Sequence, residues 1–133
     1  MIRTFLDANV LVSAGQGNRR DAEAALLILQ QSDRIFLASP FLRLEVLPHA
    51  HREKQWVSVK LYEQYFARAE SCDNLEAILQ GADEEMLRTA LGLADALHIS
   101  AAALLGADEF ITGEGTNKPI YRNTLVKVVR FFV

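Results

Sequence analysis

The chain has 133 residues, of which 50% are hydrophobic and 23% are charged. This length and composition predict one globular domain with its own core, over residues 1–133, and exclude a disordered chain. The formal net charge is −3, from 14 Lys and Arg against 17 Asp and Glu, whereas nucleic-acid-binding proteins usually carry excess positive charge. The charge therefore argues against nucleic-acid binding unless some acidic side chains are neutralised in the folded protein.

The single cysteine, Cys72, excludes an internal disulfide, which is consistent with a reducing cytosol. The N-terminus lacks the basic flank and apolar region of a signal peptide. The longest apolar run, around 99–105, is far shorter than the roughly 18–20 residues that a membrane span needs. We therefore expect a soluble cytoplasmic protein without a membrane segment.

The first half of the chain begins with an apolar segment over 2–6 that predicts a strand ending just before Asp7. One helix, capped by its first residue, is expected over 21–31. The segment 34–38 predicts a second strand. Ser39 followed by proline is typical of a helix start, and Pro48 should end or kink that helix.

The second half of the chain is richer in helix. Apolar residues recurring every four positions predict a long helix over 53–70. The segment 74–79 is ambiguous, and we interpret it as a short strand because Gly81 follows it. Two further helices are expected over 83–91 and 94–105, the second ending at a glycine.

The C-terminal part is predicted to contain a strand over 109–112, a loop over 113–121 and a last apolar strand over 126–133. Short apolar strands therefore alternate with helices along most of the chain. This order predicts an α/β fold with a parallel sheet covered on both faces by helices.

Four carboxylates occupy positions that need an explanation. In open parallel sheets, ligands bind beyond the carboxyl ends of the strands. Asp7 ends the first strand and Glu114 follows the fourth. Glu45 and Asp95 lie among apolar neighbours on helices, where a lone carboxylate is expensive to desolvate unless it is paired or holds a metal. Carboxylates that converge repel one another and raise their pKa values, which a divalent cation would relieve.

Mg²⁺ takes oxygen ligands and keeps several waters, so few carboxylates suffice to hold it. Such a site can activate water and neutralise charge on a phosphodiester, and it would remove the charge objection to nucleic acid. A structural alternative stays open for each residue: Asp7 as a turn residue, Asp95 as a helix cap, and Glu114 as an exposed loop residue. Glu45 fits such an alternative least, because apolar residues flank it in mid-helix.

Four segments carry a resemblance to the PIN-domain family: DANVL at 7–11, LEV at 44–46, ADALH at 94–98 and GADEFITGE at 106–114. Their order and spacing cover nearly the whole chain. The resemblance implies a three-layer α/β/α sandwich around a parallel sheet. It also implies an endoribonuclease that needs Mg²⁺ or Mn²⁺ and hydrolyses single-stranded or structured RNA. Many family members are toxins of bacterial toxin–antitoxin pairs, which implies an antitoxin partner, and many form homodimers.

The resemblance also implies roles for individual residues. The metal-binding and catalytic carboxylates would be Asp7, Glu45, Asp95 and Glu114. Asn9 and Thr112 would be supporting polar residues beside them. Glu114 stands where the family usually has an aspartate, so the level of activity and the preferred metal stay open.

Two other functions remain alternatives. The chain could be a PIN-fold nucleic-acid-binding module that has lost turnover, or a metal-dependent phosphatase acting on small substrates. We interpret His98 as a packed or hydrogen-bonding helix residue rather than a metal ligand, and His49 and His51 as surface or substrate-rim residues. Cys72 is interpreted as a small buried hydrophobe.

Overall fold

A computed structural model describes residues 1–131 of the chain. Its centre is a five-stranded sheet in which all neighbouring strands are parallel, in the order β3-β2-β1-β4-β5. The strands are β1 (Ile2–Leu6), β2 (Arg34–Ala38), β3 (Glu70–Ser71), β4 (Glu109–Thr112) and β5 (Val128–Arg130). The predicted α/β fold with a central parallel sheet is therefore confirmed.

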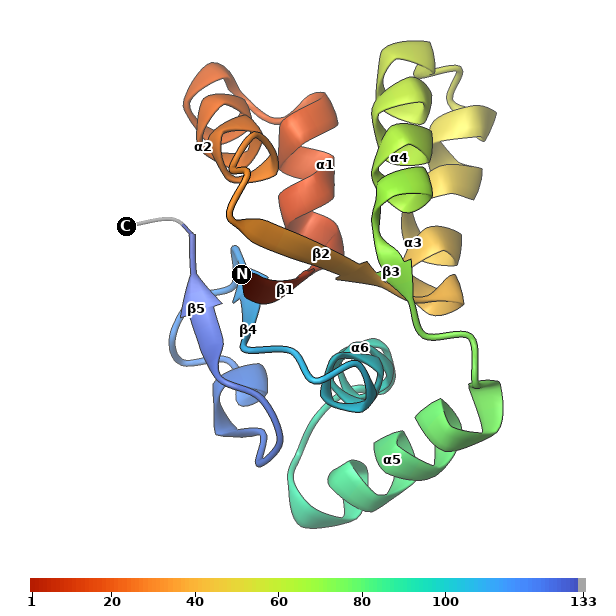
Figure 1. Ribbon diagram of the computed structural model, residues 1–133, viewed down its shortest axis with the longest axis vertical. Helices are drawn as coiled ribbons and strands as arrows, with labels where there is room; N and C mark the ends of the chain where they lie inside the picture. The colour runs from red at the N-terminus through yellow and green to blue at the C-terminus, as the bar shows by residue number, and fades with distance from the viewer. Residues whose placement is uncertain (132–133) are drawn as a thin grey trace.

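Helices cover both faces of the sheet. They are α1 (Ala8–Gln16), α2 (Arg19–Leu29), α3 (Pro40–Arg52), α4 (Trp56–Arg68), α5 (Leu75–Arg88) and α6 (Leu93–Leu104), with a short 3₁₀ helix, η1 (Pro119–Arg122). Figure 1 shows α1 to α4 above the sheet and α5 and α6 below it, which makes three layers. Among the described residues, no helix is both long and apolar enough to cross a membrane.

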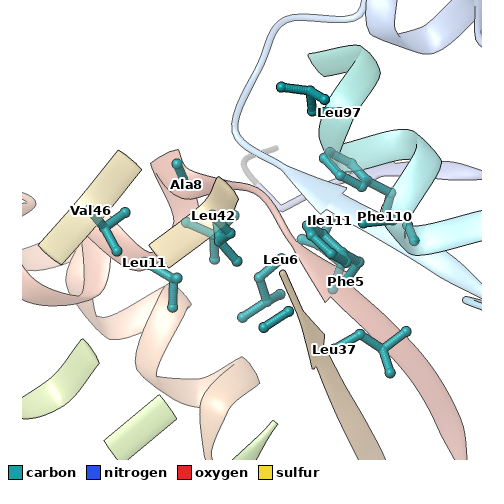
Figure 2. Packing of buried hydrophobic residues seen from close by; sticks show 14 of the residues in the cluster. Phe5, Leu6, Ala8, Leu11, Leu37, Leu42, Val46, Leu97, Phe110 and Ile111 are labelled. Carbon is teal, nitrogen blue, oxygen red and sulfur yellow. The ribbon is translucent and has the colours of Figure 1, made fainter. Parts of the chain in front are cut away.

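The core lies on both sides of β1, the central strand. Phe5 and Leu6 are fully buried, and successive strand residues point to opposite faces. Figure 2 shows Leu6 on the side of α1 and α3, near Leu11 and Leu42, and Phe110 beside α6. The Phe5 and Phe110 rings stack with their centroids 5.5 Å apart. Burial on both faces explains why this strand is almost wholly apolar.

The predicted strand over 74–79 is wrong, because these residues form the first turns of α5. Asn74 caps the helix by accepting a hydrogen bond from the Ala77 backbone N–H. Gly81 does not end an element but marks the place where α5 approaches α6, since a Cβ there would collide with the Ser100 hydroxyl. That hydroxyl donates to the Ile78 carbonyl at 2.8 Å. A helix contact distant in sequence therefore decides this segment, and the strand after α4 lies earlier, at β3.

Several element boundaries also differ from the predictions. Two helices, not one, separate β1 from β2, and the cap of α2 is Asn18 rather than Asp21. Helix α3 continues past Pro48, at an exposed position where water can bond the carbonyl that proline leaves free. Helix α4 is shorter than the predicted 53–70.

The C-terminal predictions hold in outline. The segment predicted as a loop over 113–121 contains the start of η1, and the last strand is shorter than predicted. The end of that predicted strand, 132–133, lies outside the described residues.

The topology brings four distant segments to one edge of the sheet. All strands are parallel, so β1 and β4 end side by side at the carboxyl edge. Helices α1 and α3 begin there, directly after β1 and β2. Helix α6 leads into the start of β4, so it runs back across the sheet and its first turn lies at the same edge. The fold therefore collects residues near 7, 45, 95 and 114.

Candidate functional site

Asp7 lies at the centre of the carboxyl edge and is 6% exposed. It is the N-cap of α1, and its Oδ1 accepts a hydrogen bond from the Ala8 backbone N–H at 2.8 Å. Its Oδ2 accepts from the Thr112 hydroxyl, also at 2.8 Å. Burial raises the pKa of Asp7 above its usual 3.8, and these hydrogen bonds offset the rise only in part. Asp7 is thus a helix cap and also a buried carboxylate whose ionised form is under-stabilised.

Asn9 and Thr112 join the end of β1 to the end of β4 beside Asp7. The Asn9 Oδ1 accepts from the Gly113 backbone N–H at 2.9 Å. Its Nδ2 lies 3.4 Å from both Asp7 Oδ2 and Thr112 Oγ1. Thr112 is fully buried, and its Oγ1 also accepts from the Glu114 backbone N–H. The structure therefore brings the two predicted supporting residues into contact with the predicted carboxylate.

Asp95 lies in the first turn of α6 and is partly buried. The cap of this helix is Gly92, so the alternative of Asp95 as a helix cap is wrong. Burial raises the pKa of Asp95 to about 6, and neighbouring negative charges add to the rise while His98 lowers it. Those negative charges belong to the three other predicted site residues, Asp7, Glu114 and Glu45.

Glu45 enters the site from α3 and is held by His98 of α6. The His98 Nε2 lies 2.8 Å from the Glu45 Oε1. The His98 ring is 1% exposed, whereas the Glu45 side chain is 40% exposed. The interpretation of His98 as a packed, hydrogen-bonding helix residue is confirmed. Its link to Glu45 also ties α3 to α6 across the mouth of the site.

Glu114 lies in the half-buried loop after β4, and its backbone is fixed at both ends. Its N–H donates to the Thr112 hydroxyl, and its carbonyl accepts from the Tyr121 hydroxyl at 2.8 Å. Tyr121 is not marked by any local sequence pattern, because its contact with Glu114 depends on how η1 folds back onto the loop.

Within the described residues, His98 is the one basic side chain that pairs with this cluster, through Glu45. Among residues 1–131, no lysine or arginine forms an ion pair with any of the four predicted site carboxylates. A hard divalent cation is therefore suited to the cluster by ligand type and by charge. As they stand, no three His, Cys, Asp or Glu side chains of the described part are arranged to hold a metal ion. The donor set fits such an ion, but the side chains are not already closed around one.

The other residues singled out from the sequence lie apart from this cluster. His49 and His51 are exposed on the last turns of α3, where His49 contacts Arg52 and His51 lies 3.6 Å from Glu63. Their interpretation as surface residues is confirmed. Cys72 is 7% exposed within the hydrophobic core, as predicted.

Comparison with known proteins gives the family. The PIN-domain family model matches residues 4–115, which include the whole cluster at the carboxyl edge. No curated protein is significantly similar to the chain in sequence. The chain belongs to the PIN-domain family, and its five-stranded parallel sheet is the PIN-like fold that the sequence motifs implied.

Solved structures with the same fold include several toxin–antitoxin assemblies. VapBC2 from Rickettsia felis, bound to a DNA fragment from their promoter, matches with a TM-score of 0.74 and 16% identity, over 97% of this chain and 98% of that one. DNA-bound VapBC from Salmonella typhimurium matches with a TM-score of 0.70 and 15% identity, over 98% and 99%. A toxin–antitoxin complex from Klebsiella pneumoniae matches with a TM-score of 0.64 and 19% identity, over 86% and 88%.

Proposed function

We propose that this PIN-domain protein is a divalent-metal-dependent endoribonuclease that hydrolyses single-stranded or structured RNA. In this proposal Mg²⁺ or Mn²⁺ is held by Asp7, Glu45, Asp95 and Glu114. The observation that carries it is a cluster of carboxylates with which no lysine or arginine among residues 1–131 forms an ion pair. Asp95 has a pKa of about 6 because it is partly buried and surrounded by the three other carboxylates. Strongly perturbed carboxylates at the carboxyl edge of a parallel sheet are typical of functional sites.

The residues of the chain have distinct parts in this proposal. Asp7 is fixed by two hydrogen bonds, so one ligand is already oriented before an ion binds. Asp95 has a raised pKa, and a bound cation would lower that pKa and favour the ionised carboxylate. A bound divalent ion would supply activation of water and neutralisation of the phosphodiester. In this proposal the nucleophile is water, so no side chain has to attack the phosphorus.

The proposal extends to partners. The likeness to chains of VapBC2 and of a toxin–antitoxin complex supports a toxin role with an antitoxin protein as partner. We propose that the protein also forms a homodimer and acts in the cytoplasm on RNA. Within residues 1–131 no arginine or lysine is paired with the cluster, so RNA contacts would depend on the bound ion as well as on surface cations.

A PIN-fold nucleic-acid-binding module without turnover is the second candidate. Two observations favour it: the side chains are not arranged as a ready metal site, and Glu114 replaces the aspartate implied by the family resemblance. The longer side chain moves its carboxylate outward by about one C–C bond. A metal-dependent phosphatase remains a possible activity for the same carboxylates.

The test is cleavage of fluorescent single-stranded and hairpin RNAs with Mg²⁺, with Mn²⁺ and with EDTA. Asp7→Asn and Asp95→Asn remove charge at constant size, and Asp83→Asn does the same on the exposed face of α5 as the matched control. We expect ion-dependent cleavage that falls at least about 100-fold, or about 2.7 kcal/mol, in the two site variants. Asp83→Asn should cleave like the wild type.

Other outcomes separate the candidates. Cleavage that persists in EDTA, or in both site variants, would overturn the metal-dependent mechanism. RNA binding without cleavage under either ion would favour the binding module. Turnover of p-nitrophenyl phosphate without RNA cleavage would favour a phosphatase.

A further inference from the structure

His98 is a buried histidine with one satisfied and one unsatisfied ring nitrogen. Its Nε2 contacts the Glu45 Oε1 at 2.8 Å. Its Nδ1 is buried and has no hydrogen-bond partner within the part of the chain that the structure describes. A buried polar atom without a partner destabilises the fold, a cost that a leucine at this position would not carry. The presence of histidine therefore needs an explanation, and among the described residues its one hydrogen bond is to Glu45.

The His98 ring is held rigidly from behind. It is 1% exposed and packs on Phe5, with ring centroids 5.9 Å apart. Phe5 in turn stacks on Phe110, and both phenylalanines are fully buried. Because the interior is close-packed, this stack fixes the direction of Nε2 relative to the central strands. The position of the His98 ring is therefore set by its packing against the central strands.

Glu45 is the more exposed member of the pair. Its side chain is 40% exposed, and within the described residues its carboxylate makes a single hydrogen bond, the one to His98. A glutamate side chain has several rotatable bonds, so ordering it without a partner costs conformational entropy. The hydrogen bond selects one orientation in which Oε1 is engaged and Oε2 stays free.

The chemistry of the contact fixes its direction. An ionised carboxylate only accepts hydrogen bonds, so the proton of the bond lies on Nε2. The other ring nitrogen, Nδ1, has no hydrogen-bond partner among the described residues. His98 therefore acts toward Glu45 as a hydrogen-bond donor.

We propose that His98 is a positioning residue that orients the Glu45 carboxylate for a divalent ion. This inference rests on the proposed function, because it concerns how one proposed ligand is prepared. Outer residues that hydrogen-bond a metal ligand fix its orientation, and losing them typically weakens metal affinity 10–100-fold. The role matters here because the four carboxylates are not already closed around an ion.

The experiment is calorimetric titration of the full chain with Mn²⁺, a readout that needs no RNA. His98→Leu removes the donor, and His98→Gln keeps an amide N–H near the position of Nε2. We expect His98→Leu to weaken Mn²⁺ binding about 10–100-fold and His98→Gln to stay within about threefold of the wild type. The unfolding free energy of His98→Leu should not fall, since the unsatisfied Nδ1 goes with the ring.

A double-mutant cycle separates positioning from a general structural effect. If His98 acts through Glu45, adding His98→Leu to Glu45→Gln should weaken Mn²⁺ binding no further. A further loss in that background, or equal losses in His98→Leu and His98→Gln, would overturn the positioning role. Wild-type affinity in His98→Leu would overturn it as well.

The failure of the proposed function looks different. A wild-type protein that binds no Mn²⁺ would overturn the metal site itself, and the role of His98 with it. If His98→Leu does not fold, the folded His98→Gln protein and the Glu45→Gln background still decide the question. In that case, Mn²⁺ affinity of His98→Gln as low as that of Glu45→Gln would overturn the proposal.

Discussion

Two buried carboxylates, at opposite places in the molecule, have pKa values shifted in opposite directions. Asp7 at the carboxyl edge is 6% exposed, and Glu85 on α5 is 0% exposed. Burial raises the pKa of Asp7 above its usual value. Burial also acts to raise the pKa of Glu85, but donors from Thr124 and the Arg88 guanidinium outweigh it and hold the pKa below its usual 4.5.

The difference lies in the partners rather than in the burial. The Glu85 Oε1 accepts from the Thr124 hydroxyl at 2.7 Å and lies 3.0 Å from Arg88 Nη1, and its Oε2 accepts from the Thr124 backbone N–H. Asp7 accepts hydrogen bonds from the Ala8 backbone and the Thr112 hydroxyl, and the nearby His98 and Glu45 act on its pKa in opposite directions. A buried carboxylate that pairs with a guanidinium stabilises the fold. A buried carboxylate that no lysine or arginine pairs with keeps a negative charge that a cationic ligand can bind. Glu85 tethers α5 to the segment before β5.

The largest expected change in unfolding free energy comes from replacing Glu85 or Asp7 by the amide of the same size. Glu85→Gln should lower the unfolding free energy by about 2 kcal/mol at pH 7, because an amide NH₂ would face the Thr124 donors and the charge-assisted bonds are lost. Asp7→Asn should leave the unfolding free energy unchanged or raise it in EDTA, since it relieves an under-stabilised buried charge. Urea unfolding followed by circular dichroism measures both.

The comparison breaks if Asp7→Asn, in the absence of metal, destabilises the fold as much as Glu85→Gln does. In that event the capping bond from Ala8 and the bond from Thr112 would require the ionised carboxylate. Asp7 would then be a structural residue of the same kind as Glu85.

A divalent ion provides a second, smaller effect. If the carboxyl-edge cluster binds Mn²⁺, then Mn²⁺ at ten times its dissociation constant should raise the unfolding free energy by about 1.4 kcal/mol. The increase should vanish in Asp95→Asn and persist in Glu85→Gln. Thermal unfolding with Mn²⁺ and with EDTA measures it, and Ca²⁺ is a useful comparison because it prefers more ligands. An equal increase in Asp95→Asn would place the stabilising ion elsewhere.

The smallest effect concerns pH. The folded-state pKa of Asp95 is about 6, above its usual 3.8, so the native state holds a proton that the unfolded chain releases between these values. Stability should therefore fall as pH rises from about 4 to about 6. The carboxyl is only partly buried and water screens its neighbours, so we expect about 1 kcal/mol.

Urea unfolding in EDTA at pH 4, 5, 6 and 7 checks this expectation against Asp95→Asn, which should show a smaller decline that comes from the raised pKa of Asp7. The pKa of Glu85 is lowered, so its contribution to stability is lost only as the pH falls below about 4.5. That loss lies outside most of this pH range. A wild-type protein with the same pH profile as Asp95→Asn would contradict the raised pKa.

The strands at 2–6, 34–38 and 109–112 have the bounds predicted from the amino-acid sequence. They lie in the middle of a parallel sheet, where burial on both faces demands a short continuous apolar run that is visible locally. The segment 74–79 could not be predicted in this way. Its apolar residues suit a strand or a helix, and the helix is favoured by the Asn74 cap together with the close approach of Gly81 to α6.

The candidate carboxylates were also recognisable from the sequence, because acidic residues at strand ends or among apolar helix neighbours conflict with their surroundings. Their partners were not recognisable. Glu45 and His98 are 53 residues apart, and Tyr121 reaches the Glu114 carbonyl only because η1 folds back. Residue type and local pattern are properties of neighbours along the chain, so they indicate the central strands, the family and the candidate carboxylates. Hydrogen-bond partners and pKa shifts depend on groups brought together across the sheet, so they follow only from the folded chain.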